Sequence, residues 1–485
     1  MKILLTTLNS KYIHTNLAIR YLNKCIERDV RNKEDFTVEV QEFTINNSED
    51  YIYNEIIAGE HDVVCFSCYI WNIEKTLHLC ENLKKALPEL KILLGGPEVS
   101  YDGEQLLEKY WFIDYIVAGE GEKLLPEVLV KISEEKCERQ LWRATPVSVD
   151  DIPFPYEDAE ENKIIYYEST RGCPYNCSYC MSSIDKKVRP LPIERVKAEL
   201  DFFLEKKVKQ VKFLDRTFNW NKERSYDIFK YLIDHDNGVT NFHFEICAEN
   251  MTDETIELIG TARKDLFQFE IGIQSTCQET LKAVDRLSDV DLLLGKIRKL
   301  IELRNCHIHV DLIAGLPYEN LERFKKSFDD VYNLYADALQ LGFLKLLKGT
   351  KIRVEEGKHG FVYDEKAPYQ IIRNDFMSAK DLNILKRVEN VLDEFHNKGG
   401  FEKSLKALVE RFDRPFDMYE AFAEFYYAQG YQKASHKKED NYRILNKFAV
   451  DVVMDDSLTQ IIYEDMENRL NFDAVKKFNR KGWAI

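Results

Sequence analysis

Three cysteines lie close together in the segment Arg171-Gly-Cys-Pro-Tyr-Asn-Cys-Ser-Tyr-Cys180, and their spacing indicates metal chemistry. The pattern C-x3-C-x2-C places the thiolates of Cys173, Cys177 and Cys180 on one short loop. Iron–sulfur clusters are held by cysteine thiolates, normally four for a 4Fe-4S cluster, so three ligands leave one iron open for chemistry. A zinc site or inert buried thiols are the alternatives. Because no further histidine or cysteine occurs before His235, we favour an iron–sulfur cluster.

The composition narrows the class of protein. The chain has 485 residues, which at roughly 150 per domain predicts about three domains. Its net charge of −16 repels phosphate backbones, so nucleic acid is an unlikely partner. No apolar run approaches the roughly 18 residues of a membrane span, and the start MKILLTTLNS lacks the apolar stretch of a signal peptide. We therefore expect a soluble cytoplasmic protein without a membrane partner, whose eleven cysteines are not a disulfide framework.

The loop STRGCPYNCSYC resembles the cluster loop of radical SAM enzymes, which carry the motif CxxxCxΦC with Φ aromatic. The resemblance implies that Cys173, Cys177 and Cys180 hold a 4Fe-4S cluster and that Tyr179 lies beside the adenine of S-adenosylmethionine. It also implies that the open iron binds the amino and carboxylate groups of S-adenosylmethionine, whose reductive cleavage yields a 5′-deoxyadenosyl radical. An electron donor such as flavodoxin or ferredoxin is then a partner.

The first part of the chain alternates strand-like and helical stretches. Apolar runs at 2–6, 62–67, 91–96 and 113–119 are separated by stretches with helical periodicity. This order predicts an α/β domain over 1–145 with a doubly wound parallel sheet. In such sheets, ligands bind outside the carboxyl ends of the strands.

Two further units follow a charged, proline-bearing linker at 146–163. Residues 164–368 contain six βα units, which favour a partial (β/α)6 barrel with its active site at the carboxyl ends of the strands; the radical SAM resemblance implies the same fold. Residues 369–485 change to a period of 3.6 and predict an all-helical domain. The strand-like runs of the barrel are 164–170, 208–215, 242–249, 266–275, 307–317 and 338–347.

The first domain lacks the GxGxxG turn of a dinucleotide site, which excludes a nicotinamide cofactor. Its segments at 8–22, 93–102 and 117–122 resemble the cobalamin-binding domain that precedes the barrel in one radical SAM subfamily. Paired glycines would let the backbone approach a large planar ligand. The resemblance therefore implies a cobalamin site, for which the candidates are Asn9, Tyr12, Ser67, Tyr69, Trp71, Gly95, Gly96, Glu98, Gly119 and Gly121.

The face of the cobalt away from the methyl group has no obvious protein ligand. The DxHxxG motif of classical cobalamin domains is absent. His14 lies in the first loop, where a hydrogen-bonding or capping role is the simpler interpretation. Tyr69 or Trp71 could block that face instead, or pack as ordinary aromatic residues.

Polar residues at the ends of the predicted barrel strands are candidates for binding S-adenosylmethionine. Alternation places Glu245 and Glu249 on one face of their strand, and a carboxylate within a barrel must find polar partners. Asp215 could instead cap the next helix. Arg286 is interpreted as an exposed helical residue, with contact to the cofactor carboxylate as the alternative. The resemblance implies cofactor contacts from Asp215, Glu245, Glu249, Glu270, Gln274 and Asp311.

These features predict a radical SAM enzyme that methylates an unactivated substrate carbon with the help of cobalamin. A cobalamin-dependent radical rearrangement or cyclisation is the first alternative, and a non-catalytic metal-binding scaffold is the second. No motif in the sequence identifies the substrate, the oligomeric state or the role of the helical domain.

Overall fold

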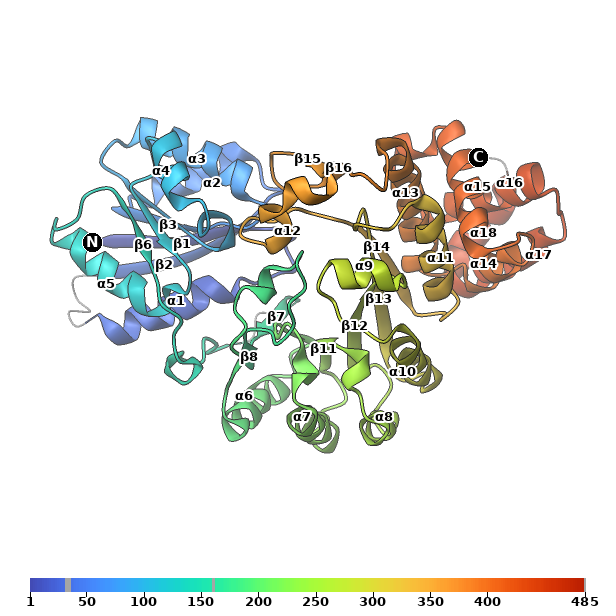
Figure 1. Ribbon diagram of the computed structural model, residues 1–485, viewed down its shortest axis with the longest axis horizontal. Helices are drawn as coiled ribbons and strands as arrows, with labels where there is room; N and C mark the ends of the chain where they lie inside the picture. Colours follow the sequence, from blue (N-terminus) through green and yellow to red (C-terminus); the bar gives the residue numbers. More distant parts are fainter. Residues whose placement is uncertain (31–35, 159–161, 484–485) are drawn as a thin grey trace.

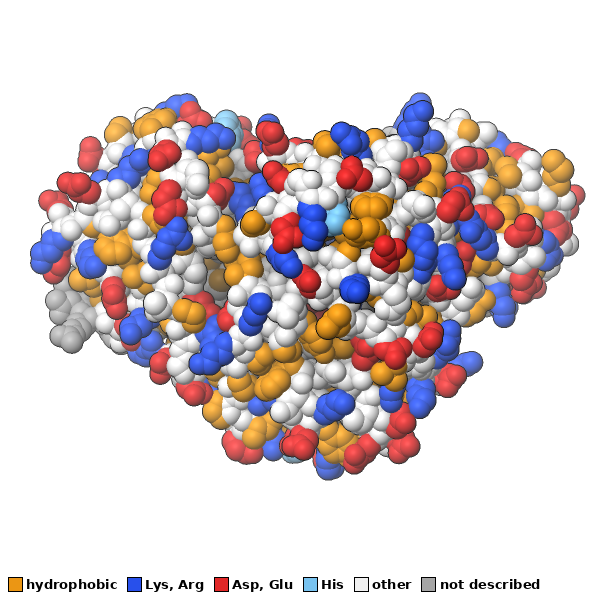
Figure 2. All heavy atoms as spheres, viewed as in Figure 1, with side chains coloured by type: hydrophobic (Ala, Val, Ile, Leu, Met, Phe, Trp, Pro, Cys, Tyr) orange, Lys and Arg blue, Asp and Glu red, His pale blue; other side chains and the backbone are white. Residues whose placement is uncertain are grey.

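The computed structural model describes residues 1–30, 36–158 and 162–483. An N-terminal α/β unit, a central barrel and a C-terminal helical unit lie side by side (Figure 1). Acidic and basic side chains are interspersed over the face of the molecule in Figure 2. No helix among the described residues is both long enough and apolar enough to span a membrane.

The N-terminal unit is a doubly wound sheet, as predicted. Six parallel strands follow the order β2-β1-β3-β4-β5-β6, and helices pack on both faces. The strands are β1 (Lys2–Asn9), β2 (Thr37–Thr44), β3 (Val63–Ser67), β4 (Lys91–Gly95), β5 (Tyr115–Ala118) and β6 (Gln140–Arg143). Helices α1 (Leu17–Asp29) and α5 (Gly121–Ser133) cover one face, whereas α2 (Glu49–Ala58), α3 (Ile73–Ala86) and α4 (Gly103–Lys109) cover the other.

Strands β2 and β6 are absent from the sequence prediction. They read TVEVQEFT and QLWR, and both form edges of the sheet where few of their side chains are buried. An edge strand does not need the continuous apolar run that marks a strand buried on both faces. The four predicted strands are the four central ones, β1, β3, β4 and β5.

The central unit is the predicted partial barrel. Its six parallel strands follow the order β14-β13-β12-β11-β10-β7, and β7 and β14 do not pair with each other. The strands are β7 (Ile164–Tyr167), β10 (Gln210–Phe213), β11 (Asn241–Ile246), β12 (Phe267–Gln274), β13 (His307–Ala314) and β14 (Ala338–Phe343). The helices between them are α6 (Ile193–Glu205), α7 (Lys222–Asp234), α8 (Asp253–Gly260), α9 (Gln278–Ala283), α10 (Val290–Glu302) and α11 (Leu321–Tyr332).

The N-terminal unit contacts the free edge of the barrel. His14 forms a parallel bridge with Ile164 of β7, whose amide donates to the carbonyl of Ile13 over 2.7 Å. The described part of the linker packs against α6, where Arg195 donates to the carbonyls of Val149 and Ile152. Linker residues 159–161 lie outside the described residues. These contacts hold the two sheets in one arrangement.

The C-terminal unit is helical, as predicted. It contains α13 (Ala379–Leu392), α14 (Glu402–Val409), α15 (Pro415–Ala428), α16 (Lys438–Phe448), α17 (Leu458–Arg469) and α18 (Phe472–Lys481). Aromatic residues of α15, including Phe422 and Tyr426, are buried in its core, which continues into the barrel core.

Residues 344–378 form a strap that passes between the first unit and the helical unit (Figure 1). The strap carries α12 (Lys351–Val354) and a hairpin of β15 (Val362–Tyr363) and β16 (Ile371–Arg373). Tyr369 donates from its hydroxyl to buried Glu98 over 2.6 Å, and Lys348 pairs with Asp102 at 2.7 Å. The domain limits at 145, 163 and 368 remain predictions. The limit at 368 falls within the strap.

Candidate functional site

The cysteine loop leaves β7 and is held at both ends by backbone contacts. Its base is the short pair β8 (Thr170–Arg171) and β9 (Arg189–Pro190). Cys173 donates its amide to Asp185, and Ser178 donates to Val284. Gly172 has φ +84°, and a Cβ at this position would lie 2.4 Å from the carbonyl of Lys187. Only glycine fits this close approach without rearrangement.

Cys173, Cys177 and Cys180 line one cavity of about 180 Å3 at the carboxyl ends of the barrel strands. Five of the six residues predicted to bind S-adenosylmethionine line the same cavity, as does Tyr179. They come from β11, β12 and β13 and from the turn after β11, and they are Glu245, Glu249, Glu270, Gln274 and Asp311. The structure therefore brings these predicted residues together, while their roles stay a proposal.

Asp215 is the exception, and its predicted contact with a cofactor is not supported. Its side chain is buried and accepts hydrogen bonds from both the amide and the hydroxyl of Ser169, at 2.8 and 2.5 Å. Burial raises its pKa to about 6, despite these hydrogen bonds. It does not cap the next helix either, because Asn221 caps α7. Asp215 instead holds the backbone that leads into the cysteine loop.

Two carboxyl groups in the cavity have opposite electrostatic environments. Glu270 lies 3.0 Å from both Lys212 and His243. Burial raises the pKa of Glu270, but the hydrogen bond from His243 and the Lys212 ammonium outweigh it and lower the value to about 2. Burial and the charges of Glu270 and Glu245 raise the pKa of Asp311 to about 8. Glu270 is therefore ionised at neutral pH, whereas Asp311 is mostly protonated.

Arg286 is a site residue that the sequence interpretation placed wrongly on an exposed helix. It follows α9, is partly buried and lines the cavity. One terminal nitrogen lies 3.8 Å from the sulfur of Cys177, and the other donates to the carbonyl of Gly272. Cys247 also lines the cavity. The position of Arg286 depends on the packing of its loop against the cluster segment, which local periodicity does not report. Cys247 lies between Glu245 and Glu249, so the alternation that placed those two residues could also have identified it.

The unpaired atoms of this cavity fit a polar cofactor. Gln274 Oε1 and Arg286 Nε are buried without a hydrogen-bond partner among the described residues, and the nearest partner of Asp311 Oδ1 is His309 Nε2 at 3.5 Å. Buried polar atoms are normally paired, so these atoms indicate a ligand with both donors and acceptors. The hydroxyl, amino and carboxylate groups of S-adenosylmethionine meet that requirement, and three clustered thiols meet that of a 4Fe-4S cluster.

A second cavity of about 440 Å3 lies at the carboxyl edge of the first sheet and extends to the cysteine loop. Its floor is apolar, with Leu5, Ile19 and Leu93 among the lining residues. Gly96 has φ +97°, and a Cβ there would lie 2.6 Å from the carbonyl of Cys68. Of the predicted cobalamin residues, six line this cavity: Ser67, Tyr69, Gly95, Gly96, Gly119 and Gly121.

The other four predicted cobalamin residues do not line the cavity. Their side chains make hydrogen bonds or a cation–π contact elsewhere. Tyr12 is 71% exposed and lies under the ammonium of Lys163, whereas Asn9 donates to Glu42. Glu98 is buried and accepts from the strap residue Tyr369.

Trp71, the fourth, donates to the carbonyl of Leu8 and stacks on Tyr69, with ring centroids 4.5 Å apart. Tyr69 is therefore the aromatic residue of this pair that can face a ligand. His14 does not line the cavity and contacts the hydroxyl of Tyr166 at 2.8 Å, which agrees with its interpretation as a hydrogen-bonding group.

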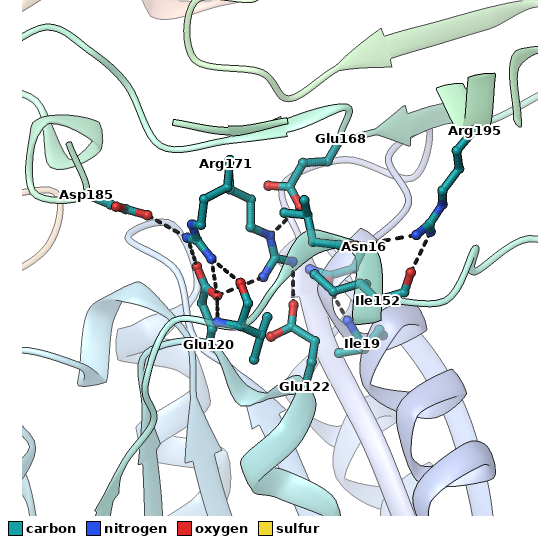
Figure 3. A network of polar contacts seen from close by, with 12 residues as sticks. Asn16, Ile19, Glu120, Glu122, Ile152, Glu168, Arg171, Asp185 and Arg195 are labelled. Carbon is teal, nitrogen blue, oxygen red and sulfur yellow. Dashed lines mark hydrogen bonds and ion pairs between the residues drawn. The ribbon is translucent and has the colours of Figure 1, made fainter. Parts of the chain in front are cut away.

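A network of charged residues connects the cysteine loop to the first unit (Figure 3). Arg171, two residues before Cys173, pairs with Glu122, with Glu168 at 2.8 Å and with Glu120 at 3.3 Å. Glu120 and Glu122 belong to the first unit, at the start of α5. Arg189 pairs with Glu120 and with Asp185. The network fixes the cysteine loop against the wall of the second cavity, and sequence spacing contains no signal for it.

Comparisons with known proteins agree with this architecture. Models for a B12 binding domain and for the radical SAM superfamily match residues 3–129 and 167–331, and a model described as a protein of unknown function (DUF4080) matches 357–484. The cobalamin-dependent radical SAM methyltransferase TokK of Streptomyces tokunonensis is 26% identical over 308 residues, which are 55% of this chain and 44% of that protein. The chain spans a little under half the length of the curated relatives that it matches first.

Two solved structures share the fold. The cobalamin-dependent S-adenosylmethionine radical enzyme OxsB, with aqua-cobalamin and S-adenosylmethionine bound, has a TM-score of 0.65 at 15% identity and covers 100% of this chain and 84% of that chain. The radical S-adenosylmethionine methyltransferase TsrM from Kitasatospora setae has a TM-score of 0.62 at 17% identity and covers 76% of this chain and 79% of that chain. At these identities the likeness shows the fold.

Proposed function

This chain carries a B12-binding domain followed by a radical SAM domain, and from this premise we propose that it is a cobalamin-dependent methyltransferase acting on an unactivated carbon. The observation that carries the proposal is the arrangement of two cavities that share a wall at Arg216. One cavity holds three thiols and polar side chains, and the other has an apolar floor and glycine-bordered walls. A substrate between them would reach both cofactors.

The residues of the smaller cavity have separate tasks in this proposal. Cys173, Cys177 and Cys180 would hold the 4Fe-4S cluster. Arg286, adjacent to Cys177, supplies donors for a carboxylate, and Asp311, mostly protonated at neutral pH, donates a hydrogen bond to an acceptor. The chemistry that the bound groups supply is reductive cleavage of S-adenosylmethionine to a 5′-deoxyadenosyl radical and donation of a methyl group from cobalamin.

The residues of the larger cavity position the second cofactor. Gly96 and Gly119, both with positive φ, let the chain pack closely on the backbone of Cys68 and Ala144, and this packing shapes the wall of the cavity. Leu5, Ile19 and Leu93 exclude water from the floor. No histidine lines this cavity among the residues described in 1–30, 36–158 and 162–483, so we propose that no imidazole ligand is offered from the floor.

Anaerobic reconstitution with iron, sulfide and cobalamin tests the proposal. We expect iron–sulfur absorbance, about one bound cobalamin per chain, and formation of 5′-deoxyadenosine after reduction, with a flavodoxin- or ferredoxin-type protein as the natural donor. The matched control is Cys177→Ala, which should retain cobalamin and lose 5′-deoxyadenosine formation. Iron binding without cobalamin would contradict the cobalamin assignment, and absence of 5′-deoxyadenosine in the wild type would contradict any radical SAM activity.

The mass of the product separates methylation from the other radical outcome. A methylated product gains one CH2 for each methyl group transferred, whereas an isomer formed by rearrangement keeps the mass of its substrate. An unchanged mass would therefore overturn methyl transfer without affecting the assignment of the cofactors.

A further inference from the structure

Arg216 lies where a substrate of the proposed reaction has to bind. It follows Asp215 at the end of β10 and is the one residue, within the described part of the chain, that lines both cavities. Its side chain is exposed to this space. A substrate carbon that is activated from one cavity and receives a methyl group from the other must lie between them. Arg216 is therefore beside the substrate rather than behind either cofactor.

The guanidinium of Arg216 is unpaired, unlike its neighbours. Arg171 and Arg189 each pair with two or more carboxylates, and Arg286 donates to a backbone carbonyl. No hydrogen bond or ion pair of the Arg216 side chain occurs with the described residues, and its only contact of this kind is through its backbone carbonyl, which accepts from Thr217. Among the arginines that line the two cavities, Arg216 is thus the one whose guanidinium makes no hydrogen bond or ion pair with the described residues.

The charge of Arg216 affects the pKa of two nearby groups, and neither group forms an ion pair with it. Burial raises the pKa of Glu245, and the Arg216 charge counteracts this effect, yet the two side chains do not form an ion pair. Burial raises the pKa of the Tyr69 phenol in the larger cavity, and the Arg216 charge counteracts part of this effect. The guanidinium therefore acts on both cavities and remains available to a ligand.

Binding of a ligand removes water from around the Arg216 guanidinium, and this desolvation costs free energy. Cofactors and substrate displace water from the two cavities, and a guanidinium that loses its hydration requires an anionic partner. Its planar fork matches a carboxylate or a phosphate through two parallel hydrogen bonds. We propose that Arg216 binds the substrate and that the substrate carries a carboxylate or phosphate group. This inference rests on the proposed function and adds the chemical class of its substrate.

The experiment uses anaerobic enzyme loaded with cluster, cobalamin and S-adenosylmethionine, and titrates it with inorganic phosphate or acetate by isothermal calorimetry. We expect saturable binding of at least one of these anions to the wild type. Arg216→Gln should weaken it by about tenfold or more, because a charge-assisted pair is lost, and Arg216→Lys should fall between. Arg298→Gln, which removes an exposed arginine of α10, is the matched control and should bind like the wild type.

The carboxylate of S-adenosylmethionine is the other possible partner, and a second arm distinguishes it. The affinity for S-adenosylmethionine is measured for the same variants in the absence of added anions, and Arg216→Gln should change it by less than about twofold. A loss of about tenfold would overturn the inference, because Arg216 would then serve the cofactor. Anion binding that is absent, or unaffected by Arg216→Gln, would overturn it as well.

Failure of the proposed function gives a different result from failure of this inference. If the proposed function is wrong, the wild type lacks bound cobalamin or 5′-deoxyadenosine formation. If only the inference is wrong, both are present and the anion titration fails. Cluster content and circular dichroism of each variant, compared with Arg298→Gln, confirm that the substitution leaves the protein folded.

Discussion

Removing Arg171 tests whether the charged network of Figure 3 holds the first unit against the cysteine loop. The side chains of Arg171 and Glu122 are each 11% exposed, so water screens their attraction little. Breaking such a buried pair from one side costs about 3–5 kcal/mol, because it leaves an uncompensated charge. Arg171→Met leaves three carboxylates close together, those of Glu120, Glu122 and Glu168. We expect a loss in this range in the free energy of unfolding.

A double-mutant cycle assigns that loss to the pair. Glu122→Gln alone should cost less than Arg171→Met, because Arg171 keeps Glu120 and Glu168. The double variant should lose about 1–3 kcal/mol less stability than the sum of the losses in the two single variants. The reason is that removing the Glu122 carboxylate relieves part of the repulsion among the three carboxylates that Arg171→Met leaves behind. Urea denaturation of the four proteins measures these differences, and the slope of each transition shows whether the variants remain comparable.

An exposed ion pair provides the control for this cycle. Lys230 and Asp234 lie one turn apart on α7 and are 53% and 50% exposed. Their coupling should be close to zero, because water and salt screen the attraction between exposed charges. A coupling between Arg171 and Glu122 no larger than this, or a cost of Arg171→Met below about 1 kcal/mol, would refute the view that the network couples the two units.

Three further predictions address the cavities and the strap. Cys177→Ala should abolish iron–sulfur absorbance, whereas Cys247→Ser, in the same cavity, should retain it. The pKa of Asp311, about 8 in the folded protein, exceeds the unfolded value near 3.9, so its contribution to stability is lost as pH rises from about 4 to 8. Asp311→Asn should therefore gain up to about 3 kcal/mol relative to the wild type between pH 5.5 and 7.5 in the cofactor-free protein, and a constant difference in thermal midpoint would contradict this. Tyr369→Phe, which leaves buried Glu98 without its hydroxyl donor, should cost about 1–3 kcal/mol in urea unfolding, and no change would show that the strap contributes little.

The central strands of the first sheet could be predicted because each is mostly buried and reads as an apolar run, whereas the barrel strands could be predicted from apolar residues at alternate positions, as in FQFEIGIQ of β12. β3 reads VVCFS and is buried throughout, and β4 reads KILLG with its three central residues buried. The edge strand β2 escaped prediction because its exposed side chains follow no such rule.

The candidate site shows the same division. Strand alternation places Glu245 in the cavity wall, since side chains two apart share a face. Asp215 and Arg216 lie in the turn after β10, where alternation no longer applies; Asp215 was expected to contact the cofactor, and no position was predicted for Arg216. Asp215 is drawn inward by Ser169, and Arg216 extends into both cavities.

The sequence by itself determined the loop proposed to hold the cluster and the α/β class of the chain, because both depend on residues near each other along the chain. Three cysteines within eight residues indicate a metal-binding loop wherever that loop lies in the fold, and apolar runs indicate strands before the strands pair. Only the tertiary structure decided which charges are paired. Arg171 finds Glu122 across 49 positions of sequence, whereas Arg216 finds no partner among the described residues. Ion pairing depends on distances of a few ångströms between segments remote in sequence, and folding alone sets those distances.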